Sequence, residues 1–314
     1  MQFAVIGNPI EHSLSPEIHL AFAMQVGLEL TYDRILAPPD DFQTMARNFF
    51  SGSGTGLNVT APFKHDAYEF VDEKDQASIA ASAVNTIHAV GDVFLGYNTD
   101  GIGLVADLSR LRWPLKQAKI LVIGAGGAAQ GIVLPLLEHG AEITLANRTR
   151  SRAEALKKQF PKIDVLDLEE LKQGWDIVIN ATAAGWQQEQ LPVPSATFED
   201  ARCYDLGYQR DGRTPFIQQV EAYADETSDG LGMLVEQAAE AFQIWHDIKP
   251  QTSPVLNGLR NPKRQFIAGA VCPRCNQQDT IYVERDLLGN VTLRACSACN
   301  YVEDVDGNVS VDLL

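Results

Sequence analysis

Residues 119–208 alternate between short apolar runs and helical patterns, and this alternation restricts the fold more than any other feature of the chain. The apolar runs predict buried strands, and the segments between them have the length and spacing of helices. Strands and helices in alternation form a parallel sheet that is covered by helices on both faces. We therefore expect the α/β class, with a parallel doubly wound sheet of the Rossmann type in this part of the chain.

A glycine-rich turn of the pattern GxGxxA follows the first of these strands, over 124–129. The first glycine allows a tight turn, the second lets the backbone approach a pyrophosphate, and a small third residue lets helix and strand pack closely. An ordinary βα turn can be as rich in glycine, but the strand before this turn and the apolar helix after it favour dinucleotide binding. The residues expected to cradle the phosphates are Gly124, Ala125, Gly126, Gly127 and Ala128.

The end of the second strand predicts which dinucleotide is bound. A site for NAD carries Asp or Glu about 20 residues after the turn, where it binds the ribose hydroxyl. This chain has Asn147, Arg148 and Thr149 there, with Arg152 one turn later. A guanidinium can pair with a 2′-phosphate, and no carboxylate opposes it. We therefore predict NADP(H); the alternative is a basic helix start that is merely solvated.

Length and charge restrict the class of partner. The chain has 314 residues, enough for about two domains with a small addition. Its net charge of −16 disfavours binding to nucleic acids and anionic membranes. The first residues include neither a basic segment nor a long apolar run, so we expect no signal peptide and a cytoplasmic location. Residues 120–137 carry no charge, but the glycine turn divides them, which argues against a membrane span.

The first hundred residues predict a mixed α/β unit ahead of the nucleotide-binding sheet. Strand patterns alternate with helical ones, and two strands over 83–97 are joined by a hairpin turn at Gly91-Asp92. Hydroxyl, amide and charged groups gather just after several strands, where α/β folds bind ligands. Such groups suit a polyhydroxylated substrate, and they are Ser13, Ser15, Asn58, Thr60, Lys64, Asn85, Thr86, Asn98, Thr99 and Asp100.

Eight short motifs occur in an order that resembles one enzyme family: NPIEHSLSP, NVTAPFK, AVNT, NTDG, GAGGAA, NRT, INAT and DGLGMLVEQA. Together they resemble shikimate dehydrogenase of the bacterial AroE type over residues 1–257. The resemblance implies the reversible reduction of 3-dehydroshikimate to shikimate with NADPH, in the pathway to chorismate and the aromatic amino acids. It also implies a substrate domain over 1–101 and 232–257, an NADP-binding domain over 102–231, and a cleft between them.

The resemblance further implies a role for each residue in the motifs. Lys64 would be the catalytic acid and base, with Asp100 beside it. The substrate would be bound by Ser13, Ser15, Asn58, Thr60, Lys64, Asn85, Asp100, Tyr208 and Gln237. NADP(H) would be held by Gly124, Ala125, Gly126, Gly127, Ala128, Asn147, Arg148, Thr149, Arg152, Leu206 and Gly230.

The predicted role of Lys64 depends on its neighbours, because a lone lysine at the start of a helix is usually just solvated. Hydride transfer to a carbonyl leaves an alkoxide that needs a proton, and a positioned lysine can supply it. Burial would lower the pKa of Lys64 and the Asp100 carboxylate would raise it, and the sequence leaves this balance open. Tyr97 and Gly207 depart from the family pattern near the cleft, so a preference for quinate stays an alternative.

Four of the five cysteines form two CxxC pairs, Cys272 with Cys275 and Cys296 with Cys299. Twenty residues separate the pairs, a spacing typical of a zinc ribbon with four cysteine ligands, and a hairpin turn is expected at Gly289-Asn290. Redox-active pairs or a two-disulfide clip are the alternatives. We predict a linker over 258–268 and a module over 269–314 that holds a structural Zn²⁺, because its core is too small to fold well alone. Cys203 is expected to be a small buried hydrophobe.

The cysteine-bearing segment resembles a small bacterial family of metal-binding proteins, the YheV-like group, and so looks like a fused neighbour of the enzyme. Its few basic residues form no dense stripe, which disfavours nucleic acid and leaves a protein partner open. Besides the quinate-preferring enzyme, a second alternative for the whole chain is a scaffold that has lost catalytic activity and whose ribbon binds protein or RNA. The intact Lys64 and Asp100 argue against it. A homodimer is compatible with the sequence.

Overall fold

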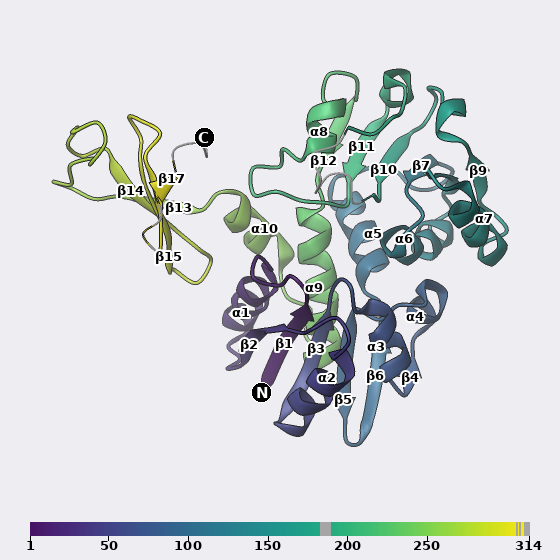
Figure 1. The fold of residues 1–314 in the computed structure, drawn as a ribbon, viewed down its shortest axis with the longest axis horizontal. Coiled ribbons are helices and arrows are strands. Elements are labelled where there is room, and N and C mark those ends of the chain that lie inside the picture. Colours follow the sequence, from purple (N-terminus) through teal and green to yellow (C-terminus); the bar gives the residue numbers. More distant parts are fainter. Residues whose placement is uncertain (183–189, 306, 308, 311–314) are drawn as a thin grey trace.

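Three β-sheets follow one another along the chain (Figure 1). The computed structural model describes residues 1–182, 190–305, 307, 309 and 310. The first sheet with its helices is called the first domain, the second sheet with its helices the second domain, and the third, small sheet the cysteine module. Helices α5 (Asp100–Arg110) and α9 (Leu231–His246) connect the two domains, and Figure 1 shows the cysteine module to one side, next to α10 (Thr252–Arg260).

The first domain has a mixed sheet in the order β2-β1-β3-β5-β6-β4. Strands β1, β2 and β3 run parallel, whereas β5 is antiparallel to β3 and forms a hairpin with β6. The predicted hairpin is thus confirmed, and Gly91 takes a φ of 61° in its turn. The elements are β1 Gln2–Gly7, α1 Ser15–Val26, β2 Thr31–Leu36, α2 Phe42–Ser51, β3 Gly54–Val59, α3 Lys64–Phe70, β4 Glu73–Lys74, α4 Gln76–Ala81, β5 Thr86–Val90 and β6 Val93–Tyr97.

The second domain has a sheet in the order β12-β11-β10-β7-β8-β9, in which all strands run parallel. Side chains of β7 alternate between two apolar cores: Ile120 and Val122 face one, Leu121 and Ile123 the other. The predicted α/β class and doubly wound sheet are confirmed. The elements are β7 Lys119–Ile123, α6 Gly127–Glu138, β8 Glu142–Ala146, α7 Arg150–Gln159, β9 Asp164–Leu166, η1 Leu168–Glu170, β10 Ile177–Asn180, η3 Ser195–Phe198, β11 Arg202–Asp205, α8 Pro215–Val220 and β12 Glu226–Ser228.

The uncharged stretch over 120–137 is divided as predicted, into β7 and the start and body of α6. Within the described part of the chain, no helix has both the length and the apolar character needed to cross a membrane.

Helices α5 (Asp100–Arg110) and α9 (Leu231–His246) cross closely between the two domains. A Cβ on Gly103 would lie 2.7 Å from the backbone nitrogen of Gln237, so glycine is required for this approach. A Cβ on Gly232 would likewise overlap the buried carboxylate of Asp107. The crossing brings the start of α5, with Asp100, beside Gln237 on α9.

The cysteine module is an antiparallel sheet in the order β13-β14-β15-β16-β17. Among the described residues, Cys272 and Cys296 form a buried cluster with Ile281 and Tyr301, and Tyr282 and Ala295 are buried as well. The strands are β13 Lys263–Phe266, β14 Ile281–Arg285, β15 Val291–Cys296, β16 Val302–Asp304 and β17 Val309–Ser310. The predicted module also includes residues 306, 308 and 311–314, which lie outside the described residues.

The predicted linker over 258–268 is wrong, because helix α10 continues to Arg260 and strand β13 begins at Lys263. Helix α10 spans Thr252–Arg260 and buries Val255, Leu256 and Leu259 in the apolar core that α1 and α9 share. Strand β13 pairs with β14, so the sheet of the module already begins at Lys263. Proline and glycine made the segment resemble a loop, but Pro254 lies in the first turn of α10, where a missing N–H is tolerated.

His19 on α1 is buried in the first domain and stacks on Tyr32, with ring centroids 4.5 Å apart. Burial, and after it the nearby His246, lower the pKa of His19 to about 3 from an ordinary value of 6.5. Below pH 6.5 the unfolded chain therefore binds a proton at this position that the folded chain excludes. Between pH 6.5 and about 3, the free energy of unfolding is expected to decrease as the pH is lowered. This histidine alone contributes about 1.4 kcal/mol per pH unit.

Urea unfolding at several pH values between 7 and 4 checks this, with His19→Phe as the comparison. Phenylalanine keeps the stacking and cannot titrate, so the free energy of unfolding of the variant should depend less steeply on pH. The difference between the two slopes should correspond to about one proton taken up on unfolding. Equal slopes for both proteins would contradict the assignment.

Candidate active site

A cleft of about 330 Å³ lies between the first and the second domain, within the range of small-molecule sites. It is reached by the ends of strands β1 and β3 and by the starts of helices α1, α3 and α5. Its walls combine polar groups of the first domain with residues of the second domain and of α9. The lining residues are Val5, Pro9, Ile10, His12, Ser13, Ser15, Asn58, Val59, Thr60, Lys64, Asn85, Asp100, Ala128, Leu206, Tyr208, Gly230, Met233, Leu234 and Gln237.

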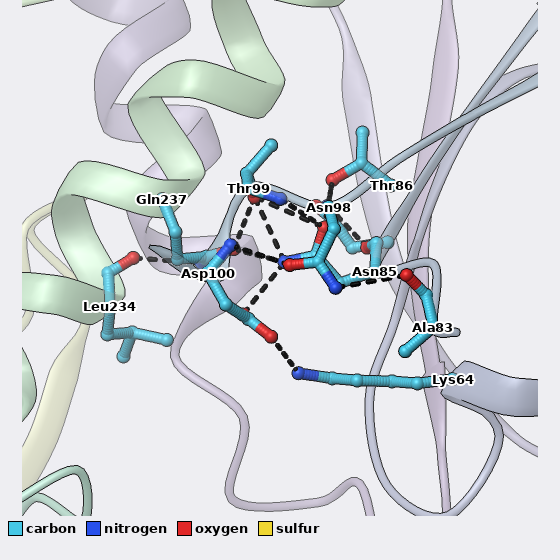
Figure 2. A network of polar contacts seen from close by, with 10 residues as sticks. Lys64, Ala83, Asn85, Thr86, Asn98, Thr99, Asp100, Leu234 and Gln237 are labelled. Atoms are coloured by element: carbon cyan, nitrogen blue, oxygen red, sulfur yellow. Dashed lines mark hydrogen bonds and ion pairs between the residues drawn. The ribbon is translucent and has the colours of Figure 1, made fainter. Parts of the chain in front are cut away.

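Lys64 and Asp100 form an ion pair on the wall of this cleft. Lys64 Nζ donates to Asp100 Oδ2 at 2.6 Å (Figure 2). The side chains are 32% and 12% exposed, so the pair is sheltered but open to the cleft. Lys64 begins α3 and Asp100 begins α5, which explains why residues 36 positions apart meet here.

A network of amides and hydroxyls fixes Asp100 in place. Asn85 Nδ2 donates to the second carboxylate oxygen, Asp100 Oδ1, at 2.8 Å and to Thr99 Oγ1 at 3.0 Å. Asn85 Oδ1 accepts from the backbone N–H of Thr99 at 2.9 Å. Gln237 Oε1 completes the group, at 3.4 Å from Asn85 Nδ2 and 3.2 Å from Thr99 Oγ1 (Figure 2). Both oxygens of Asp100 are therefore committed, one to Lys64 and one to Asn85.

Asn58 lines the cleft, but its side chain is already engaged inside the protein. Its Nδ2 donates to Thr86 Oγ1 at 2.9 Å and to the carbonyl of Asn85 at 3.2 Å, and its Oδ1 accepts from the Tyr32 hydroxyl at 2.6 Å. In this structure Asn58 thus orients the strand ends around Asn85. Sequence reasoning missed Tyr32 because its partner lies 26 residues away on another strand.

The remaining predicted substrate residues lie on the same cleft. Ser13, Ser15 and Thr60 come from the first domain, Tyr208 from the loop after β11, and Gln237 from α9. The loop before α1 is held by Arg34, whose guanidinium donates twice to the carbonyl of Ser13. Burial raises the pKa of Tyr208, against the effect of nearby Arg210, so its phenol stays protonated at neutral pH. Arg34 was missed because a lone arginine in a strand carries no motif.

The glycine-rich turn joins β7 to α6. Gly124 has a φ of +117°, and a Cβ there would lie 2.8 Å from the carbonyl oxygen of Ala181. A Cβ on Gly126 or Gly127 would meet open space, so the backbone of the turn is accessible to a ligand. The free N–H groups at the start of a helix such as α6 are what a phosphate site requires. Ala128, Leu206 and Gly230 line the cleft and so connect this turn to Lys64 and Asp100.

Two arginines after β8 present unpaired positive charge. Arg148 and Arg152 are exposed, and neither forms an ion pair with the part of the chain that the structure describes. Asn147 Nδ2 caps the turn by donating to the carbonyl of Thr149 at 2.8 Å. Arg150, between them, differs because it is paired with Asp167 at 2.6 Å and with Glu154 at 3.3 Å.

The four predicted metal ligands come together in the cysteine module. Their sulfur atoms all lie within 4.8 Å of one another, and Cys272–Cys299 and Cys275–Cys296 are each 3.7 Å apart. A tetrahedral ion with Zn–S bonds of about 2.3 Å separates its sulfurs by ~3.8 Å, so the cluster has the dimensions of a four-thiolate zinc site. The same distances exceed a disulfide bond of about 2.05 Å, and all five cysteines are free.

Backbone N–H groups support this cluster. The amide of Arg274 points at Cys272 Sγ (3.4 Å) and that of Ala298 at Cys296 Sγ (3.3 Å), the arrangement of two metal-binding knuckles. Burial opposes ionisation of Cys296, but hydrogen bonds with the Thr280 hydroxyl, the Ala298 amide and the neighbouring Cys272 and Cys299 together outweigh it and lower its pKa to about 6. The fifth cysteine, Cys203, differs, because burial raises its pKa to about 12 and makes it a poor nucleophile.

The second domain has the doubly wound fold that binds dinucleotides, and it meets the first domain across a polar cleft lined by a lysine–aspartate pair. This combination defines a nicotinamide-dependent oxidoreductase. Comparison with known protein families gives the same class. The family "Shikimate dehydrogenase substrate binding domain" matches residues 5–87, "Shikimate / quinate 5-dehydrogenase" matches 107–189, and "Shikimate 5'-dehydrogenase C-terminal domain" matches 230–259. The chain belongs to the shikimate dehydrogenase family. Residues 262–313 match a separate family, "Probable metal-binding protein (DUF2387)".

Individual relatives are similar over the same range. A shikimate dehydrogenase (NADP(+)) of Legionella pneumophila is 47% identical over 262 residues, which cover 83% of this chain and 98% of that protein. Among solved structures, an Ael1 enzyme from Pseudomonas putida is 38% identical with a TM-score of 0.79, over 83% of this chain and 98% of that one. Shikimate 5-dehydrogenase from Thermus thermophilus in complex with NADP(H) and shikimate is 32% identical with a TM-score of 0.77, with the same coverage. The predicted family resemblance, with its fused metal-binding module, is confirmed.

Proposed function

We propose that this chain catalyses the reversible, NADP-dependent reduction of 3-dehydroshikimate to shikimate. The observation that carries the proposal is the Lys64–Asp100 pair at 2.6 Å in a polar cleft that also reaches the dinucleotide turn. The Legionella relative, named for NADP(+), and the Thermus complex with NADP(H) and shikimate support the same substrate and cofactor.

Lys64 is proposed to act at the oxygen of the reacting carbonyl. NADPH, when bound, supplies the hydride to the carbonyl carbon. Lys64 donates a hydrogen bond to the carbonyl oxygen and then a proton to the alkoxide, and it recovers a proton from the solvent that its partly exposed side chain can reach. Asp100 keeps the lysine oriented through its contact with Lys64 Nζ. In the oxidative direction the neutral amine accepts the hydroxyl proton.

The substrate is proposed to be bound from both sides of the cleft. Ser13 and Ser15 are placed to hold its carboxylate, because they lie at the N-terminal end of α1, where a negative charge is favoured. Thr60, Tyr208 and Gln237 supply hydroxyl and amide groups for the ring hydroxyls. Asn58 and Asn85 act mainly by holding Thr86, Thr99 and Asp100 in position, since their own polar atoms are engaged.

Arg148 is proposed to bind the 2′-phosphate that distinguishes NADP from NAD, with Arg152 beside it. A charge-assisted hydrogen bond contributes about 1.5–3 kcal/mol, and about 1.4 kcal/mol corresponds to a tenfold change in affinity. Arg148→Ala is therefore expected to raise KM for NADP by about tenfold or more and to leave KM for NAD nearly unchanged.

Initial-rate kinetics with both cofactors check this prediction, and Arg150→Ala is the matched control. Arg150 lies two residues after Arg148, at the start of α7, but its guanidinium is occupied by Asp167 and Glu154, so its loss should change neither KM by more than about twofold. A wild-type protein that uses NAD with a KM equal to or below that for NADP would overturn the cofactor assignment.

The choice of substrate is tested by initial rates with shikimate and with quinate, each with NADP and with NAD. The proposal requires the highest kcat/KM for shikimate with NADP. Higher kcat/KM for quinate would favour the quinate/shikimate alternative, which the matched family name "Shikimate / quinate 5-dehydrogenase" keeps open. Absence of turnover with either substrate would favour the scaffold alternative.

The cysteine cluster is proposed to hold one structural Zn²⁺. The sulfur spacing and the four-thiolate donor set suit this ion, and a site with four protein ligands leaves no open position for a reactant. We further propose a cytoplasmic location, where thiols stay reduced, and a protein rather than a nucleic acid as any partner of the module. A homodimer is compatible with these assignments.

A further inference from the structure

The cysteine module touches the dehydrogenase through the hairpin between β14 and β15. Leu287 in this hairpin is half-buried and packs on the core cluster formed by α1, α9 and α10, which includes Leu14, Ile18 and Leu256. Gly258 on α10 faces it so closely that a Cβ there would overlap Leu287 Cδ2. The absence of a side chain at Gly258 thus makes the recess that Leu287 fills.

The backbone of the same leucine holds a carboxylate of the first domain. The N–H of Leu287 donates to Glu17 Oε1 at 2.9 Å. The other oxygen, Glu17 Oε2, accepts from Arg210 Nη2 of the second domain at 3.3 Å. Glu17 is only 9% exposed, so its charge is sheltered and depends on these two partners. One buried carboxylate therefore joins the module, the first domain and the second domain.

Three segments lead from Leu287 to the cleft: α1 and α10, which it contacts, and the loop after β11, which Glu17 and Arg260 bind. Glu17 lies in the first turn of α1, next to Ser15. Arg210 lies in the loop after β11 that carries Tyr208. Arg260 on α10 donates to the carbonyl of Gln209 at 2.6 Å and pairs with Asp229, which precedes the cleft residue Gly230.

We infer that Leu287 is a positioning residue for the substrate site: docked against Gly258 and bonded to Glu17, it holds α1 and the Tyr208 loop in the arrangement that binds shikimate. This inference rests on the proposed function. The module thus contributes to substrate affinity from outside the cleft, whereas Lys64 and Asp100, fixed by Asn85 and Gln237, do not depend on it.

The test uses two single variants of the full chain and their combination. Leu287→Ala removes the packing side chain. Gly258→Ala fills the recess and pushes the hairpin away, although alanine itself favours a helix. Each is expected to raise KM for shikimate about three- to tenfold, with kcat within about twofold and KM for NADP unchanged. The double variant should resemble Leu287→Ala alone, because the overlap with the added methyl group is gone.

Three controls separate positioning from general damage. Leu287→Met keeps an apolar chain of similar volume and should restore KM to near the wild-type value. Val291→Ala, at an exposed position of the same hairpin, should change nothing. Metal content should equal that of the wild type in all variants, which shows that the module is intact.

Hydrogen exchange without substrate gives a second readout. The amides over 207–212 should exchange faster in both single variants than in the wild type or in Val291→Ala. An unchanged KM or an unchanged exchange rate in the single variants overturns the inference. A wild-type protein without activity on shikimate overturns the proposed function instead, and the exchange measurement then still decides whether the module supports the Tyr208 loop.

Discussion

Replacing Lys64 with alanine is expected to lower kcat for shikimate oxidation by about 10²–10⁴-fold, the usual contribution of a positioned acid–base group. Lys64 is partly exposed to the cleft and its ammonium contacts Asp100 at 2.6 Å, so the substitution removes the proton donor without opening the core. The fold should persist, because Asn85 still holds Asp100. Steady-state rates together with a thermal unfolding curve measure both effects.

Lys162→Ala serves as the matched control, since Lys162 is an exposed lysine of the second domain away from the cleft. Its kcat should equal that of the wild type. A Lys64→Ala protein that retains kcat within about threefold of the wild type would exclude an acid–base role for this residue.

Replacing Cys296 with serine is expected to abolish metal binding and to unfold the cysteine module. The small apolar cluster of the module includes two of the predicted ligands, Cys272 and Cys296, so little apolar core remains without the ion. Structural zinc typically supplies about 10–16 kcal/mol in small domains of this kind. The metal content should fall from about one equivalent per chain to nearly none. The amides of β14 and β15 should lose their protection from hydrogen exchange.

Cys203→Ala is the control, because it also removes one thiol but lies in the second domain, far from the cluster in sequence and outside it in space. Its metal content should be unchanged. Reduced wild-type protein that contains less than about half an equivalent of zinc would rule out a structural zinc site.

The features that could be predicted from the sequence are those formed by residues close together in the chain. The glycine turn at 124–129, the hairpin at Gly91 and the two CxxC knuckles are each formed by a few neighbouring residues, and each lies where it was predicted. The family resemblance then placed Lys64 and Asp100 together, and the structure brings them into contact. The roles of the site residues, Lys64 and Asp100 included, stay predictions.

The features that sequence reasoning missed depend on contacts between distant segments. The predicted linker begins inside helix α10, where one proline and one glycine stand among polar and apolar residues. The three buried apolar residues of α10 pack in a core that they share with α1 and α9, and the sequence alone does not show these partners. Glu17 lies 193 residues from Arg210 and 270 residues from Leu287, and no local pattern marks such a triple contact. Neither periodicity nor a short motif reports on partners of this kind.

The close crossing of α5 and α9 has a mechanical consequence. Both passages of the chain between the two large sheets run through these helices. Gly103 lets α5 approach the backbone of Gln237 on α9, and Gly232 lets α9 approach the Asp107 side chain on α5. A change in the relative orientation of the two sheets is therefore a rotation about this crossing. Asp100 and Gln237 lie beside that axis, where such a rotation displaces atoms least.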